Sequence, residues 1–149
     1  MPIGIMPLGN SQVKLTTDGG EASRMINKTG ANSVKGTIVE IGPIDKSVKL
    51  ANIDDIDPCG IMFDDGVPDG GWIWVVTGGK AKVLYSTSVS LGTISRVPIA
   101  ADESATNGLA INEALPVPPF ATDKHFREIG HPEEAIGTPG LASTMIHFL

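Results

Sequence analysis

The stretch Gly71-Trp-Ile-Trp-Val-Val-Thr-Gly-Gly-Lys-Ala-Lys-Val-Leu-Tyr-Ser86 decides the fold that we predict. Two apolar runs flank Gly78 and Gly79. Two adjacent glycines suit a two-residue type I′ turn, because this turn needs positive φ at both central positions and glycine adopts positive φ readily. The turn would place Trp74 opposite Val83. We therefore expect a β-hairpin whose base is buried together with both indole rings, and whose lysine-bearing tip is exposed to solvent.

Composition indicates one β-rich domain. The 149 residues are enough for one domain with a core and too few for two. Eighteen Gly and 11 Pro residues punctuate the chain at short intervals, which favours many short strands. The predicted fold class is all-β: a small β-barrel or β-tulip-like meander with an extended N-terminal arm and a loop-rich C-terminal part closed by a terminal strand.

Residues 1–33 are expected to form the extended arm. Repeated prolines and glycines in this segment argue against a long helix or a long central strand. The segment is nevertheless too apolar for a solvated tail, so we expect it to lie on its own domain or on a neighbouring subunit. The residues predicted to make this contact are Ile3, Ile5, Met6 and Leu8.

Residues 34–149 are expected to form a single β-rich domain. Its meander core covers about residues 35–100, and a loop-rich part with a closing strand covers about residues 101–149. Within the second part, residues 101–119 read as a long exposed loop. The other expected strands are residues 36–41, 47–51, 59–63, 95–100 and 141–149.

Charge and hydropathy exclude two classes of partner. Seventeen acidic and 11 basic residues give a net charge of −6, and no cluster of Lys and Arg would neutralise a phosphate backbone. No segment approaches the length of a membrane span, and the N-terminus lacks the basic region of a signal peptide. We expect no nucleic-acid or membrane partner, and synthesis in a cytoplasm.

Cys59 is the single cysteine, so an internal disulfide is excluded. A nucleophilic thiol would need a nearby histidine or a positive helix end to lower its pKa, and the local sequence supplies neither. We expect Cys59 to be a small buried hydrophobe.

The densest set of titratable groups contains His125, Glu128 and His131. The six-residue step between the histidines does not place them on one helical face, and zinc-ligand spacing is absent. The segment reads as a polar surface with local charge pairs, and His147 as a strand histidine with its hydrogen bonds satisfied. The sequence predicts no catalytic residue, no cofactor and no metal site.

Six aspartates bracket the expected third strand. Paired carboxylates can serve a glycosidase, and acidic loops can bind calcium, but the ligand pattern of an EF-hand loop is incomplete here. Aspartate is also a common residue of β-turns, so solvated turn residues are the interpretation we prefer. The six are Asp54, Asp55, Asp57, Asp64, Asp65 and Asp69.

Three stretches form a familiar pattern: Gly36-Thr-Ile-Val-Glu-Ile41, Pro58-Cys-Gly-Ile-Met62 and residues 71–84. They resemble small β-rich virion proteins of tailed bacteriophages, especially head decoration (cement) proteins. Residues 125–134 and 146–149 look like the ending of related phage structural proteins. The resemblance implies a non-enzymatic protein on the outer surface of an icosahedral head. It further implies a homotrimer, with the major capsid protein as partner, that stabilises the mature shell.

Two alternatives share part of this pattern. A phage tail or fibre component would have the same β-rich plan. A small carbohydrate-binding module or hydrolase would use Trp72, Trp74 or the aspartate-rich loops, provided that the indoles are exposed.

Overall fold

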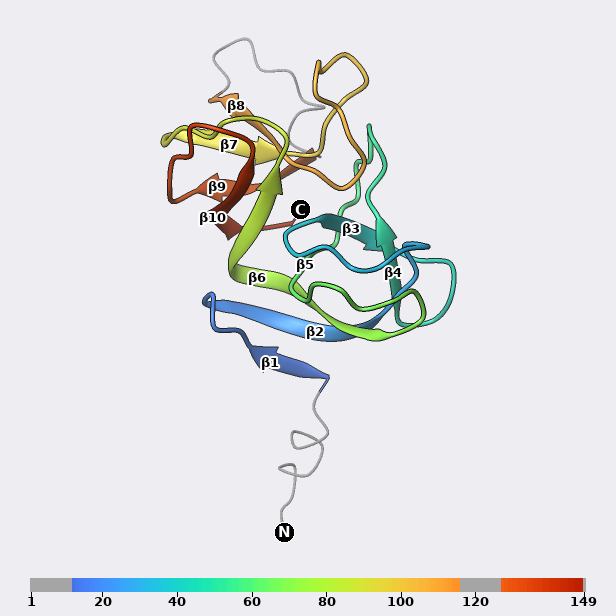
Figure 1. Cartoon of the computed structure of the whole chain (residues 1–149). Helices are drawn as coiled ribbons and strands as arrows, with labels where there is room; N and C mark the ends of the chain where they lie inside the picture. The colour runs from blue at the N-terminus through green and yellow to red at the C-terminus, as the bar shows by residue number, and fades with distance from the viewer. Residues whose placement is uncertain (1–11, 116–126, 149) are drawn as a thin grey trace.

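The structure is a computed structural model that describes residues 12–115 and 127–148, and the elements completed within them are strands (Figure 1). The predicted arm contacts Ile3, Ile5, Met6 and Leu8, and also His125, lie outside the described residues. The strands are β1 (Val13–Leu15), β2 (Gly20–Asn27), β3 (Ile38–Ile41), β4 (Ser47–Leu50), β5 (Gly60–Met62), β6 (Trp72–Tyr85), β7 (Thr93–Arg96), β8 (Ile111–Ala114), β9 (Glu128–Pro132) and β10 (Gly140–Ile146). The all-β fold class is confirmed. No helix within the described ranges is long and apolar enough to cross a bilayer.

The ten strands form one sheet in the order β1-β2-β4-β3-β5-β6-β10-β9-β7-β8, with an additional pairing of β2 with β6. This pairing turns β2, β4, β3, β5 and β6 into a partial ring of five strands that is not a closed barrel. The ladders of β2 with β4, β3 with β5 and β5 with β6 contain only two residue pairs each. Three of the strand pairings that form the partial ring are therefore short.

The predicted hairpin at Gly78 and Gly79 is wrong, because β6 is one bent strand of 14 residues that runs through both glycines. Its first half pairs with β2 and β5, and its second half pairs with β10. Of the two glycines only Gly79 has a positive φ, at 79°, whereas a type I′ turn needs positive φ at both. Thr77 is an extra residue against β2 and forms a β-bulge, which bends the strand toward the second half of the sheet.

Close backbone approach explains why glycines occupy this bend. A Cβ atom at Gly79 would lie 2.8 Å from the carbonyl oxygen of Gly19, and one at Gly20 would lie 2.3 Å from that of Lys80. The start of β2 and the middle of β6 cross here with no room for side chains. The same local sequence that suits a tight turn thus serves a bend and a crossing.

Two clusters of buried apolar side chains form the core. The smaller contains Val39, Val48, Met62, Ile73 and Val75, and the larger is spread over the rest of the sheet and includes Tyr85, which is 1% exposed. The Tyr85 hydroxyl lies 2.8 Å from Thr144 Oγ1 and also contacts Ser95 Oγ. A buried polar network therefore ties β6 to β7 and β10.

Strands β3, β4 and β5 appear with shorter bounds than expected, and β10 is shifted to start one residue earlier. Strand β7 overlaps the expected strand of residues 95–100 only at Ser95 and Arg96, and β1, β2, β8 and β9 were not predicted. Residues 13–27 of the expected arm belong to the sheet as β1 and β2, and β2 pairs with three other strands. Strand β8 lies inside the expected loop of residues 101–119 and pairs with β7. Glycine and proline content alone misled the prediction for these segments, since their strands depend on distant partners.

Candidate functional site

Strand β1 ends the sheet on the side of the N-terminus (Figure 1). Among the described strands it pairs only with β2, over three residue pairs. Val13 is 46% exposed and Leu15 is 81% exposed. An edge strand with exposed apolar side chains offers a template to which another chain can add a strand.

A cation–aromatic surface lies beside this edge. Trp72 and Trp74 point to one face of β6, and the register of β2 against β6 places Arg24 on the same face. The Arg24 guanidinium lies 5.1 Å from the ring centroid of Trp72, and Lys14 Nζ lies 4.6 Å from that of Trp74. Lys14 and Lys35 also lie 5.3 Å and 4.7 Å from the ring of Phe63.

The expectation that both indoles are mostly buried is wrong for Trp72, which is 44% exposed. The side chain lies near the start of β6, and Arg24 covers one face of its ring. Trp74 is half-buried against the larger core cluster, with Lys14 over its ring. Cation–π contacts thus occupy ring faces that a sugar would need for stacking.

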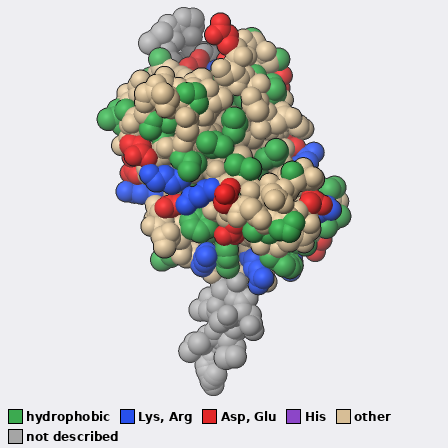
Figure 2. Space-filling view, viewed as in Figure 1, with side chains coloured by type: hydrophobic (Ala, Val, Ile, Leu, Met, Phe, Trp, Pro, Cys, Tyr) green, Lys and Arg blue, Asp and Glu red, His purple; other side chains and the backbone are tan. Residues whose placement is uncertain are grey.

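Exposed apolar side chains elsewhere are dispersed. In the face seen in Figure 2, green side chains lie among polar ones and do not gather into one broad patch. Exposed examples on three different segments are Ile44, Ile56 and Leu91. Leu15 on β1, at 81%, is the most exposed large apolar side chain in the described part of the chain.

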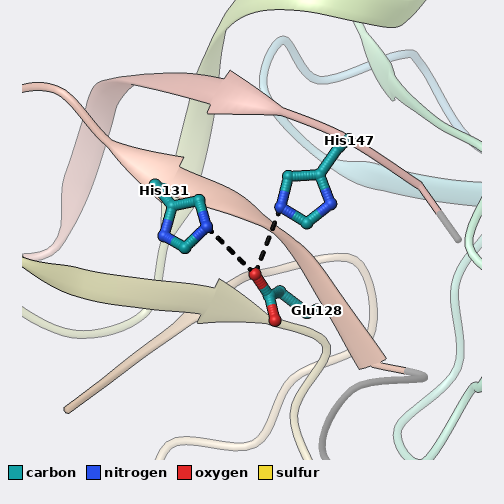
Figure 3. Close-up of side chains that lie close together, drawn as sticks. All are labelled: Glu128, His131 and His147. Atoms are coloured by element: carbon teal, nitrogen blue, oxygen red, sulfur yellow. Dashed lines mark ion pairs between the residues drawn. The ribbon is translucent and has the colours of Figure 1, made fainter. Parts of the chain in front are cut away.

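Glu128, His131 and His147 form a cluster at the other end of the sheet (Figure 3). Glu128 Oε1 lies 3.2 Å from His131 Nε2 and 3.1 Å from His147 Nε2. The two imidazole rings have centroids 5.4 Å apart and are tilted by 38°. The Glu128 side chain is 10% exposed, whereas the His131 and His147 side chains are 49% and 43% exposed.

A β-bulge brings the three side chains to one face. Ser95 pairs with Gly130 and Arg96 pairs with Glu128, so Ile129 is an extra residue in β9. In a regular strand Glu128 and His131 would point to opposite faces, and the bulge reverses the alternation between them. His147 follows β10, and its backbone N–H donates to the Ile129 carbonyl at 2.8 Å, which places its ring diagonally across from His131.

The structure thus joins two residues of the predicted polar segment, Glu128 and His131, to a histidine that sequence reasoning treated separately. His147 contacts Glu128 and does not stand alone in its strand. The pairing of β9 with β10 brings His147 to Glu128 and His131, and the spacing of residues within each segment does not reveal this pairing.

Cys59 is half-buried, and burial together with the nearby carboxylates of Asp57, Asp55 and Glu40 raises the pKa of its thiol to about 12. The thiol stays protonated at neutral pH, and a protonated thiol is a poor nucleophile.

The aspartates serve backbone turns. Asp64 accepts a hydrogen bond from the Trp74 N–H at 2.6 Å, and Asp69 accepts one from the Gly30 N–H at 2.8 Å. Asp54 accepts one from the Ala100 N–H at 3.2 Å. These carboxylates are therefore engaged in connecting loops, as expected for turn residues.

Comparison with known proteins gives a likeness of fold. No family model and no curated protein matches the chain. Among solved structures, the fold is similar to the crystal structure of the head fiber gp8.5 N base of bacteriophage phi29, with a TM-score of 0.55 and 11% sequence identity. The match covers 84% of this chain and 93% of that chain. At this identity the likeness shows a shared fold, and a shared fold does not by itself carry a function.

Proposed function

We propose that this chain is a structural virion protein of a tailed phage that binds the outer surface of the head as a decoration protein. In this role it has no catalytic activity, and it stabilises the mature capsid through contacts between subunits. The observation that carries the proposal is the fold likeness to a phage head fiber base, which extends over nearly the whole of both chains. The phage pattern of the strand sequences is a second support that does not depend on the fold comparison.

The edge strand supplies the contact surface in this proposal. Leu15 on β1 is largely exposed, and the apolar residues Ile3, Ile5, Met6 and Leu8 precede it in the chain. A strand added to β1 would form main-chain hydrogen bonds, while the exposed side chains would bury apolar area. We propose the major capsid protein and further copies of this chain, arranged as a homotrimer, as the partners. Many such contacts on one shell would sum to mechanical strength.

A head fibre component is the second candidate function. It is favoured by one specific observation, that the similar structure is described as the base of a head fiber. The two functions differ in where the protein lies on the virion. A decoration protein is distributed over the shell, whereas a fibre component is found on projecting appendages.

A carbohydrate-binding module has less support. Trp72 is exposed enough to contact a sugar, but the cations over Trp72 and Trp74 occupy ring faces of both indoles. Displacing Lys14 and Arg24 would cost the cation–π contacts before any stacking is gained.

Binding to heads tests the proposal directly. Purified protein is mixed with mature capsids that lack it, and the bound fraction is measured by co-sedimentation. We expect saturable binding that Leu15→Asp weakens about tenfold or more, because a carboxylate would have to be desolvated in an apolar contact. Leu91→Asp is the matched control, since Leu91 is 61% exposed and lies between β6 and β7. Equal loss in both variants, or no binding by the unaltered protein, contradicts the proposal.

The role and the location are tested on particles. Capsids without the protein should lose resistance to heat or pressure, and adding the protein should restore it. Electron microscopy of labelled protein on virions should show signal distributed over the head. Signal confined to fibres would favour the second candidate, and signal confined to the tail would exclude both head locations. Light scattering after size exclusion measures whether the protein is a trimer in solution.

A further inference from the structure

We propose that Glu128, His131 and His147 form a binding site for one divalent transition-metal ion, with Zn²⁺, Co²⁺ and Ni²⁺ as the class of ligand. The proposal is independent of the phage function, since it rests on the geometry of one carboxylate oxygen and two ring nitrogens. Two of the ligand atoms come from β9 and one from the residue that follows β10, and all lie within 4.8 Å of one another (Figure 3).

A backbone hydrogen bond fixes the tautomer of His131. His131 Nδ1 lies 3.2 Å from the carbonyl oxygen of Thr93. A carbonyl oxygen only accepts hydrogen bonds, so Nδ1 carries a hydrogen. In the neutral ring this places a lone pair on Nε2, which faces Glu128 Oε1 at 3.2 Å. A lone pair in this position is directed to bind a metal ion that the Glu128 carboxylate also binds.

Both histidine rings converge on one carboxylate oxygen. His147 Nε2 lies 3.1 Å from the same Oε1, so this oxygen faces two ring nitrogens. The two ring centroids are 5.4 Å apart. A single divalent ion would take all three atoms as ligands with both rings neutral.

The distances suit such an ion. Zinc binds imidazole nitrogen and carboxylate oxygen at about 2.0–2.2 Å, so two ligands of one ion lie roughly 3.0 Å apart at right angles and about 3.4 Å apart in a tetrahedron. The two observed oxygen–nitrogen distances of 3.1 and 3.2 Å fall within this range. Binding would require the two ring nitrogens to approach each other, and the His147 side chain, 43% exposed, has room to turn toward His131.

The surroundings also match a metal site. The hydrogen bond from His131 Nδ1 to Thr93 is the outer contact that holds a ligating imidazole in the right tautomer. Glu128 is nearly buried and fixed in β9, while the exposed rings leave coordination positions open to water. Arg96 lies opposite Glu128 in the register, but its guanidinium is paired with Asp102 and Glu113. Imidazole ligands favour transition metals over Mg²⁺ or Ca²⁺.

Titration of the full chain with Co²⁺ and Zn²⁺ tests the site. We expect one Co²⁺ per chain with a visible absorption band, displacement of Co²⁺ by Zn²⁺, and no response to Mg²⁺. His147→Gln and His131→Gln should each weaken Zn²⁺ binding on the order of 100-fold by calorimetry, and these exposed positions tolerate substitution. Glu128→Gln should do the same, with Glu133→Gln as the matched control, since Glu133 follows β9 and pairs with Lys80. Absence of a Co²⁺ band, or unchanged Zn²⁺ affinity in the two histidine variants, overturns the proposal.

Discussion

Replacing each of the two central glycines of β6 by alanine should give very different results. At Gly79, φ is 79° and a Cβ would lie 2.8 Å from the Gly19 carbonyl oxygen. A left-handed conformation costs a non-glycine residue about 1–2 kcal/mol, and forcing the Cβ into this crossing adds about 1–3 kcal/mol. At Gly78, a Cβ would meet nothing within 4 Å. Gly79→Ala should therefore lower the free energy of unfolding by about 3 kcal/mol, and Gly78→Ala should change it by less than about 1 kcal/mol.

Urea denaturation followed by tryptophan fluorescence measures both values, because Trp72 and Trp74 lie on the same strand. In thermal unfolding the difference amounts to roughly 6–12 °C in Tm for a chain of this size. The two substitutions also separate the bent strand from the hairpin that the sequence suggests. A type I′ turn needs positive φ at both glycines, so a hairpin would make both alanines costly. Equal destabilisation by the two variants would refute the bent strand.

Three further predictions concern side chains. Arg96→Met should lower the free energy of unfolding by about 3 kcal/mol in urea titrations, because the buried guanidinium forms ion pairs with the half-buried carboxylates of Asp102 and Glu113. A loss below about 1 kcal/mol would contradict this. Cys59 in the folded chain should react with a thiol reagent at pH 8 about 10³-fold more slowly than Cys59 in the urea-unfolded chain, because folding raises the pKa of its thiol to about 12. Equal rates in the folded and unfolded chains would be the contrary result. A hydrogen bond from Lys82 lowers the pKa of Glu134 in the folded chain. The contribution of Glu134 to stability is therefore fully present above its pKa in the unfolded chain, and it is lost as the pH falls through its pKa in the folded chain. The Glu134→Gln variant should thus be less stable at pH 7, with a difference from the unaltered protein that shrinks below pH about 4.

Sequence patterns predicted strands well where the information was local. Strand β4 carries Val48 in the core, and β3 carries the adjacent buried residues Ile38 and Val39, as a short apolar run bounded by turn residues indicates. Strand β10 was expected from its β-prone ending and is paired on both sides. In these segments propensity and burial agree, so the distant partners add nothing that changes the assignment.

Prediction failed where the partner strand decides the outcome. The segment of β2 reads as part of an arm because it begins with Gly19 and Gly20. Gly20 is required by the crossing with β6, Gly19 has a positive φ of 93°, and Asn27 at the other end of β2 is fully buried. Its side chain donates hydrogen bonds to the carbonyl oxygens of Ala31 and Val67, each at 2.9 Å. Polar and glycine-rich sequence is thus compatible with an internal strand when its groups are satisfied by chain that is distant in sequence.

Both features that the sequence concealed arise at β-bulges. Thr77 in β6 redirects the strand between two halves of the sheet, and Ile129 in β9 turns Glu128 onto the face of His131. A bulge depends on the register against a second strand, so neither could be derived from the spacing within its own segment. At β9 the extra residue Ile129 is itself buried in the core, while the nearly buried Glu128 contacts the exposed ring of His131 on the other face. The irregularity therefore serves packing and the candidate metal site together, which explains why a spacing of three residues in a strand can join an acid to an imidazole.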